Sequence, residues 1–150
     1  MSSSTHADRI RATGARATPA RLAVLRLLES ADRALSHHDV ETALDGTGID
    51  RVTLYRVLDW MVEAGLAHRV TDAQRVFRFS IANAASPTHS AHAHFRCDAC
   101  GKVFCLDDIP ATPPALPRGF ASRAVELCVT GHCDRCKQED SAPAAQTNKD

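Results

Sequence analysis

Two Cys-x-x-Cys pairs dominate the C-terminal half of this sequence: Cys97 with Cys100, and Cys133 with Cys136, separated by 32 residues. Zn²⁺ prefers four tetrahedral thiolates, and two such pairs supply a closed set with no open position for a substrate. The gap is longer than in a compact zinc ribbon, so we expect the pairs to pin the two ends of a separate C-terminal module. The alternative is four unrelated structural cysteines.

The composition and hydropathy of the chain predict a cytoplasmic protein. There is neither a run of 18 apolar residues nor a basic segment followed by an apolar one, so we expect no membrane partner and no secretion. In the reducing cytosol, six cysteines indicate metal ligands more than disulfides. The formal net charge is zero, so any binding to nucleic acid must depend on a local arrangement of arginines.

The N-terminal half carries helix signals. A helix is predicted over residues 19–29, with Thr18 as its N-cap and a proline at its first position. Ser36, followed three residues later by Asp39, predicts a short second helix to about Leu44.

A third helix is predicted over residues 51–64, capped by Asp50 and stopped by Gly65. Its apolar face is formed by Leu54, Leu58, Met61 and Val62, and its opposite face by Thr53, Arg56 and Trp60.

Residues 66–70 and 76–81 alternate in the manner of two strands joined by a polar turn, which predicts a β-hairpin. Helices closed by a hairpin make a winged helix, whose last helix enters the DNA major groove. The pattern alone leaves open a small helical domain that binds no DNA. We expect this domain over residues 7–82, after a disordered tail over residues 1–6.

The overall expectation is an α+β protein: an N-terminal winged helix and a small C-terminal α/β dimerisation domain with a four-cysteine zinc site. We place a hinge linker at 83–92, the zinc-stabilised domain at 93–136 and a disordered tail at 137–150. Strands are expected at 95–97, 102–105 and 120–129. Four prolines between residues 110 and 117 argue against a long helix there.

Four motifs occur in a recognisable order. They are residues 18–21 (T-P-A-R), 52–58 (V-T-L-Y-R-V-L), 64–66 (A-G-L) and 92–101 (H-A-H-F-R-C-D-A-C-G). From about residue 16 to residue 136 the chain thereby resembles the ferric uptake regulator (Fur) family, and most closely its zinc uptake regulators.

The resemblance implies a metal-responsive transcriptional repressor. Its C-terminal modules would dimerise, and its paired winged helices would read palindromic double-stranded operator DNA. A metal at a second, hinge-side site would favour the DNA-binding shape by binding it better than the alternative. No small organic substrate is implied.

Histidines supply candidates for that second site, because His89, His92 and His94 cluster in the expected linker. His92 and His94 match the family's H-x-H ligands. Five residues after the second cysteine of the first pair, the family usually has Glu or Asp, whereas this chain has Cys105.

His68 matches a histidine ligand of the zinc uptake regulators, although a strand histidine can also be merely structural. Those regulators tend to place a cysteine at the end of the wing, where this chain has Ser80, and His89 is a candidate to fill that place. A thiolate with imidazoles suits Zn²⁺, so we expect one structural and one regulatory zinc per chain. An iron-responsive, other-metal-responsive or peroxide-responsive regulator of the same family is the alternative.

The resemblance assigns the DNA contacts mainly to the third helix. Tyr55 and Arg56 would reach bases, and the phosphate contacts would come from Thr53, Arg51, Arg16 and Arg21. Arg69 and Arg75 in the wing are equally well explained by solubility.

Other features receive lesser roles. No His-x-Glu with a following Pro-Cys-x-x-Cys occurs, so a zinc deaminase is not indicated and we expect no enzyme. Cys128 is expected to be a buried small hydrophobe. His37 and His38 are expected to be solvated residues at a helix start.

Overall fold

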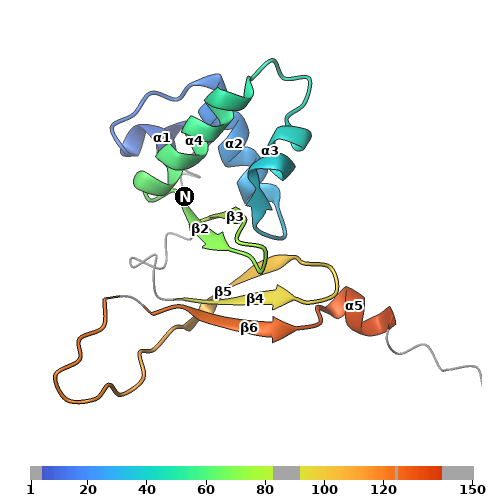
Figure 1. Ribbon diagram of the computed structural model, residues 1–150. Coiled ribbons are helices and arrows are strands. Elements are labelled where there is room, and N and C mark those ends of the chain that lie inside the picture. Colours follow the sequence, from blue (N-terminus) through green and yellow to red (C-terminus); the bar gives the residue numbers. More distant parts are fainter. Residues whose placement is uncertain (1–4, 83–91, 124, 140–150) are drawn as a thin grey trace, which may run out of the picture.

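The computed structural model describes residues 5–82, 92–123 and 125–139. It is a mixed helix and strand structure in two parts (Figure 1). A helical layer lies on one side, a small hairpin sheet lies beneath it, and a second sheet underlies both.

The N-terminal part is built from capped helices: α1 (His6–Ala12), α2 (Pro19–Ser30), α3 (His37–Ala43) and α4 (Arg51–Glu63). The predicted caps are present, because the side chains of Thr18, Ser36 and Asp50 each accept a hydrogen bond from the backbone N–H three residues later. Helix α1 was not predicted. It is opened by a capping box between Thr5 and Asp8, so the tail expected over residues 1–6 is wrong at its last two positions.

The wing is an antiparallel sheet in the order β1-β3-β2, made of β1 (Leu35–Ser36), β2 (Ala67–Thr71) and β3 (Phe77–Ile81). The predicted hairpin is confirmed, with Arg69 opposite Phe79. The short strand β1 was not predicted, and it anchors the start of α3 to the sheet through Leu35 opposite Phe79.

The N-terminal core lies between α2, α4 and the inner face of the hairpin. Its largest members, all nearly inaccessible to solvent, are Ile10, Leu25, Leu28, Leu54, Leu58, Met61 and Phe79. The apolar face predicted for α4 is buried at Leu54, Leu58 and Met61, while Val62 packs at its edge.

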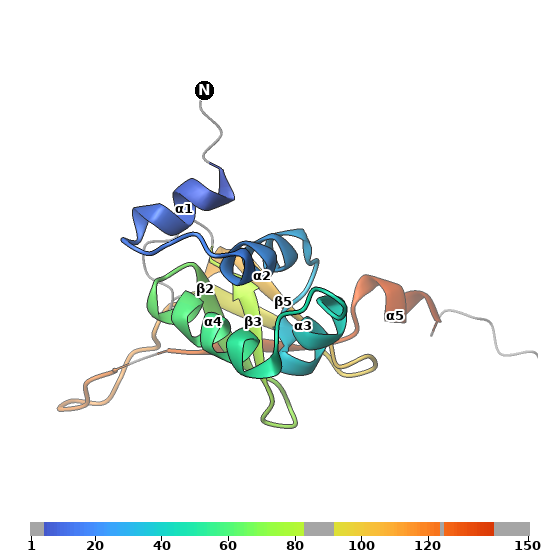
Figure 2. The ribbon, with the colours of Figure 1, turned by 90° about the horizontal axis from the view of Figure 1, so that it is seen from above.

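The C-terminal part is a three-stranded sheet in the order β5-β4-β6, followed by one short helix. Its elements are β4 (His92–Cys97), β5 (Val103–Pro110), β6 (Leu127–Gly131) and α5 (Asp134–Glu139). Strand β4 pairs antiparallel with β5 and parallel with β6. Seen from above, α5 and the connection that follows β5 lie on opposite sides of the helical layer (Figure 2).

Four boundaries differ from the sequence-based expectation. Strand β4 begins at His92, which was placed in the linker, and β5 extends to Pro110 where the expected strand ended at residue 105. The last strand occupies 127–131 and not 120–129, and α5 extends past residue 137 to Glu139. The proline-rich stretch 111–117 has no regular structure, as its composition predicts. Among the described helices, none has the length and hydropathy needed to span a bilayer.

The two parts meet at the beginning of β5. The backbone N–H of Ala34, fully buried, donates to the carbonyl of Val103 at 2.8 Å. Nearby, the guanidinium of Arg135 lies 3.2 Å from the carboxylate of Asp32. The loop that leads into β1 is therefore seated on the second sheet.

Candidate metal centres and DNA interface

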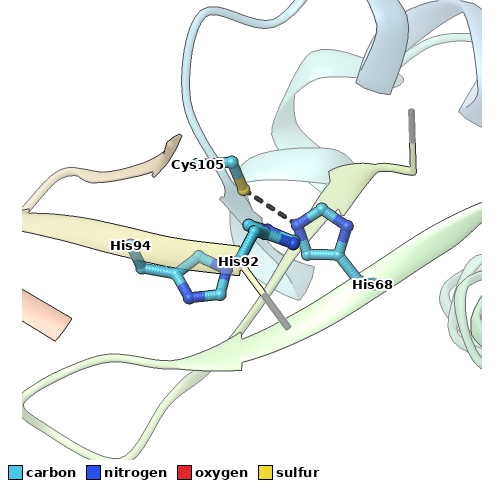
Figure 3. A group of neighbouring side chains, drawn as sticks. All are labelled: His68, His92, His94 and Cys105. Atoms are coloured by element: carbon cyan, nitrogen blue, oxygen red, sulfur yellow. Dashed lines mark hydrogen bonds between the residues drawn. The ribbon is translucent and has the colours of Figure 1, made fainter. Parts of the chain in front are cut away.

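One cluster of donor atoms lies between the wing and the second sheet. His68, His92, His94 and Cys105 each offer a ligand atom, and these atoms lie within 4.8 Å of one another. The Nε2 atom of His68 is 2.8 Å from Sγ of Cys105 (Figure 3). The ring centroid of His92 lies 4.6 Å from that of His68 and 4.5 Å from that of His94.

Strand geometry explains why these four residues converge. His92 and His94 are two residues apart on β4, so their side chains share one face of the sheet. Cys105 on β5 is the register partner of His94, and paired residues on neighbouring strands point to the same face. His68 comes from β2 in the other part of the chain. A bulge between His92 and Ala93 displaces the first of the β4 histidines from regular pairing.

The chemistry of the cluster fits one borderline-soft metal ion. Three imidazoles and one thiol form a nitrogen and sulfur donor set of the size that tetrahedral Zn²⁺ takes. His68 and His92 are only 5% and 6% exposed, so an ion held there would be shielded from bulk water. A cavity of about 220 Å³ beside the cluster is lined in part by His92, His94 and Arg69. His89, the other sequence candidate, lies outside the described residues.

A second cluster is formed by the two Cys-x-x-Cys pairs, Cys97 with Cys100 and Cys133 with Cys136. Their four Sγ atoms also lie within 4.8 Å of one another. The parallel pairing of β4 with β6 ends with Cys97 opposite Gly131, which brings the two pairs side by side. Gly101 follows Cys100 with a φ of 71°. This left-handed conformation favours glycine and allows the tight turn at the end of the first Cys-x-x-Cys pair.

Hydrogen bonds around the thiols prepare them unequally for a metal. The backbone N–H of Cys133 donates to Sγ of Cys97 at 3.4 Å, and this bond, with a second one from the backbone of Cys100, lowers the pKa of Cys97 to about 6. The hydrogen bond with the Cys133 side chain, together with burial, raises the pKa of Cys136 to about 12. Because the thiolate is the metal-binding form, Cys97 is more ready to ligate than Cys136.

The residues expected to contact DNA differ in their solvent exposure and in their contacts within the protein. Arg56 is exposed on α4, Thr53 and Tyr55 are half-buried, and all three lie within its first two turns. Arg51 is exposed as well, but its guanidinium pairs with Glu41 at 3.0 Å, which holds it against α3.

Two arginines outside α4, Arg21 and Arg69, also make contacts within the protein, whereas Arg16 is exposed. Arg21 donates to the carbonyl of Arg16 at 2.8 Å, and its guanidinium carbon lies 4.0 Å from the centre of a ring of Trp60. Arg69 lies in the same way over Phe77, at 4.4 Å. Both stacked cations can still present N–H groups toward a phosphate, because a ring contact occupies only the face of the guanidinium.

A model of the ferric uptake regulator family matches residues 12–115. The chain is 34% identical to the zinc uptake regulation protein of Escherichia coli over 133 residues, which cover 84% of this chain and 75% of that protein. The chain belongs to the ferric uptake regulator family.

The Fur-family chain is also similar to a peroxide regulator and to a zinc uptake regulator of known structure. It is 27% identical to the peroxide operon regulator of Bacillus subtilis over 141 residues, 89% of this chain and 92% of that one. A solved structure of a zinc uptake regulator complexed with zinc and DNA superposes with a TM-score of 0.63 at 26% identity, covering 86% of this chain and 88% of that chain.

Two expectations for this Fur-family chain were wrong. Cys128 is exposed, not buried. It lies on β6 as the register partner of His94 on β4, so it faces the same side of the sheet as the histidine cluster. His37 begins α3 as expected, but it is half-buried and not solvated, because its ring centroid lies 4.2 Å from that of Tyr55. The local sequence predicts neither the exposure of Cys128 nor the ring contact of His37, since both depend on which strand or helix packs beside the residue.

Proposed function

We propose that this protein is a zinc-responsive transcriptional repressor that binds palindromic operator DNA as a homodimer when its second metal site is filled. The observation that carries the proposal is the composition of the first cluster: His68 belongs to the wing, whereas His92, His94 and Cys105 belong to the second sheet. An ion bound by all four ties the two parts together. It therefore favours the arrangement in which these donors converge, by the difference in its affinity for that arrangement and for others.

We assign a separate function to each part of the chain. Residues 6–82 bind DNA, the segment 83–91 connects the two domains, and residues 92–139 form the dimerisation domain. The four-cysteine cluster holds a structural zinc, since it joins the end of β4 to α5 at the two ends of that domain. Metal binding there contributes to folding, because the site exists only when the domain is assembled.

The homodimer is supported by apolar surface on the C-terminal part. Strand β6 is an edge of its sheet, and Leu127 and Val129 on it are 41% and 45% exposed. Ile109, Leu116 and Phe120 add further exposed apolar side chains in the same part of the chain. An edge strand and exposed apolar side chains are features that a second copy would cover.

The DNA contacts in this proposal come from the exposed end of α4. Arg56 reaches a guanine bidentately, Tyr55 places its ring against a thymine methyl, and Thr53 contacts a phosphate. Arg51, Arg16 and Arg21 add backbone contacts that position the domain. No catalytic role is included. The proposal places the protein in the cytoplasm, where its six free cysteines stay reduced.

Metal identity is the part of the proposal that a direct experiment decides. Affinity for an operator duplex, selected from a random library by the zinc-loaded protein, is measured at buffered free concentrations of Zn²⁺, Fe²⁺, Mn²⁺ and Ni²⁺. The thiol and imidazole donors predict activation by Zn²⁺ at the lowest free concentration and weak activation by Fe²⁺ or Mn²⁺, which favour carboxylate-rich sites. Activation by Fe²⁺ or Mn²⁺ at lower free concentrations than Zn²⁺ would replace zinc sensing with one of the alternatives.

A further inference from the structure

His37 occupies a place that connects the wing to the recognition helix. It is the first residue of α3, and its imidazole lies between two aromatic rings. The Tyr55 ring is 4.2 Å away, centroid to centroid, at an interplanar angle of 40°, and the Phe79 ring is 4.8 Å away at 72°. Phe79 is fully buried in the core, so His37 lies in contact with both the half-buried Tyr55 ring and a ring of the core.

The electrostatic surroundings of His37 keep the imidazole neutral. Partial burial lowers its pKa, and although the carboxylate of Asp59 on α4 raises it, Arg69 on β2 lowers it again. A neutral ring packs against Tyr55 and Phe79 without the desolvation cost that an imidazolium would bear. The contact is therefore an aromatic packing contact at neutral pH.

Tyr55 needs such support because of where it lies. It is the fifth residue of α4 and is half-buried, so part of its side chain stays accessible to solvent. A side chain that reads a base contributes most when its rotamer is already fixed before binding. Of the rings in the described residues, His37 is the one recorded in contact with Tyr55.

We propose that His37 is a positioning residue that fixes the Tyr55 ring in the orientation in which it contacts DNA. The inference rests on the proposed function, in which Tyr55 touches a thymine methyl group. It adds a specificity-determining residue on α3, outside the recognition helix. The next residue, His38, is exposed, has no recorded ring contact and is the matched control.

The test compares His37→Ala, His37→Phe, His38→Ala and Tyr55→Ala as zinc-loaded proteins. Each is titrated with the selected operator duplex and with duplexes in which single thymines are replaced by deoxyuridine, which removes only the methyl group. Discrimination between thymine and deoxyuridine is a ratio of affinities, so it does not depend on the fraction of protein that is folded. Zinc content and melting temperature are recorded alongside.

We expect Tyr55→Ala to abolish discrimination at one thymine of each half-site. His37→Ala should weaken operator binding by roughly two- to tenfold, the equivalent of one aromatic contact, and reduce discrimination at that same thymine. His37→Phe, which keeps a ring, should restore discrimination, and His38→Ala should leave it unchanged. In the double variant His37→Ala with Tyr55→Ala, the two losses should not add.

Two results overturn the inference in distinguishable ways. If Tyr55→Ala loses thymine discrimination but His37→Ala and His37→Phe both keep it, His37 does not position Tyr55, and the proposed DNA contact stands. If Tyr55→Ala itself retains full discrimination at every thymine, the proposed contact of Tyr55 is wrong and the role of His37 falls with it.

Discussion

The buried carboxylate of Asp72 should be a major determinant of wing stability. Its side chain is 2% exposed and lies in the turn between β2 and β3. It accepts hydrogen bonds from the backbone N–H groups of Gln74 and Val76 and from Nε of Arg78, each at 2.9 Å. Arg78 also donates to the carboxylate of Asp39 on α3 at 3.3 Å. Through Arg78, the Asp72 carboxylate therefore connects the turn to the helical layer.

Replacing Asp72 with Ala removes the acceptor of all three donors. All three bonds have the ionised carboxylate as acceptor, and bonds of this kind contribute about 1.5–3 kcal/mol each. The loss is partly offset, because the Arg78 guanidinium keeps Asp39 as a partner and the exposed residues Gln74 and Val76 can donate to water instead. We therefore expect a loss of about 3 kcal/mol in the free energy of unfolding, measured by urea denaturation of the zinc-loaded protein. Asp45→Ala, at an exposed loop position, is the control and should change this free energy by less than about 0.5 kcal/mol.

The pH dependence provides an independent check. Burial raises the pKa of Asp72, but the hydrogen bonds from Val76, Arg78 and Gln74 outweigh it, so the pKa lies below its ordinary value of 3.8. A depressed carboxyl pKa contributes stability that is present above the unfolded value and is lost as the pH falls through the folded value. The difference between wild type and Asp72→Ala should thus be constant above about pH 5 and shrink in more acid solution. A loss no larger than that of Asp45→Ala, or one that grows on acidification, would refute this reasoning.

Three further outcomes are expected. Cys133→Ser should lose the structural zinc and give an unfolded or monomeric C-terminal part by circular dichroism and analytical ultracentrifugation; a folded, metal-free dimer would contradict the role of the four-cysteine cluster. Arg56→Ala should weaken specific operator binding by about 1–3 kcal/mol while leaving dimerisation intact, whereas equal weakening on random DNA would assign this side chain to a phosphate. Cys105→Asp should shift activation of DNA binding toward Fe²⁺ or Mn²⁺ in the buffered-metal titration, because a carboxylate is a harder ligand; unchanged metal preference would count against a ligand role for this residue.

Local signals in the sequence predicted much of the N-terminal part. The caps at Thr18, Ser36 and Asp50 were identified from side chains that satisfy the first N–H groups of a helix, and such bonds depend on residues only three positions apart. The hairpin followed from alternation. Strand β1 escaped prediction because two residues carry no periodicity, and α1 because its stability comes partly from Glu29 of α2, which bonds to His6 and Arg9.

The convergence of the site residues could be predicted only from a family resemblance or seen in a structure. The spacing of His92 and His94 placed them on one face of a strand, but nothing local relates them to His68, which lies 24 residues earlier on a strand of the other part. Cys105 became a candidate only through its offset from the first Cys-x-x-Cys pair, and register pairing with His94 now gives that offset a physical basis. The position of Cys128 was mispredicted because burial of a strand residue depends on whether another layer covers that face.

If an ion in the first cluster controls DNA binding, Cys105→Ser should abolish that control. Cys128→Ser is the matched control, since Cys128 flanks His94 on the opposite neighbouring strand but is not a member of the donor set. Operator binding is titrated against buffered free Zn²⁺ for both variants, with zinc content measured on the same samples. We expect Cys105→Ser to keep about one zinc per chain in the four-cysteine site, to remain dimeric and to lose zinc-dependent operator binding, while Cys128→Ser behaves as wild type. Unchanged zinc dependence in Cys105→Ser would contradict control by this ion.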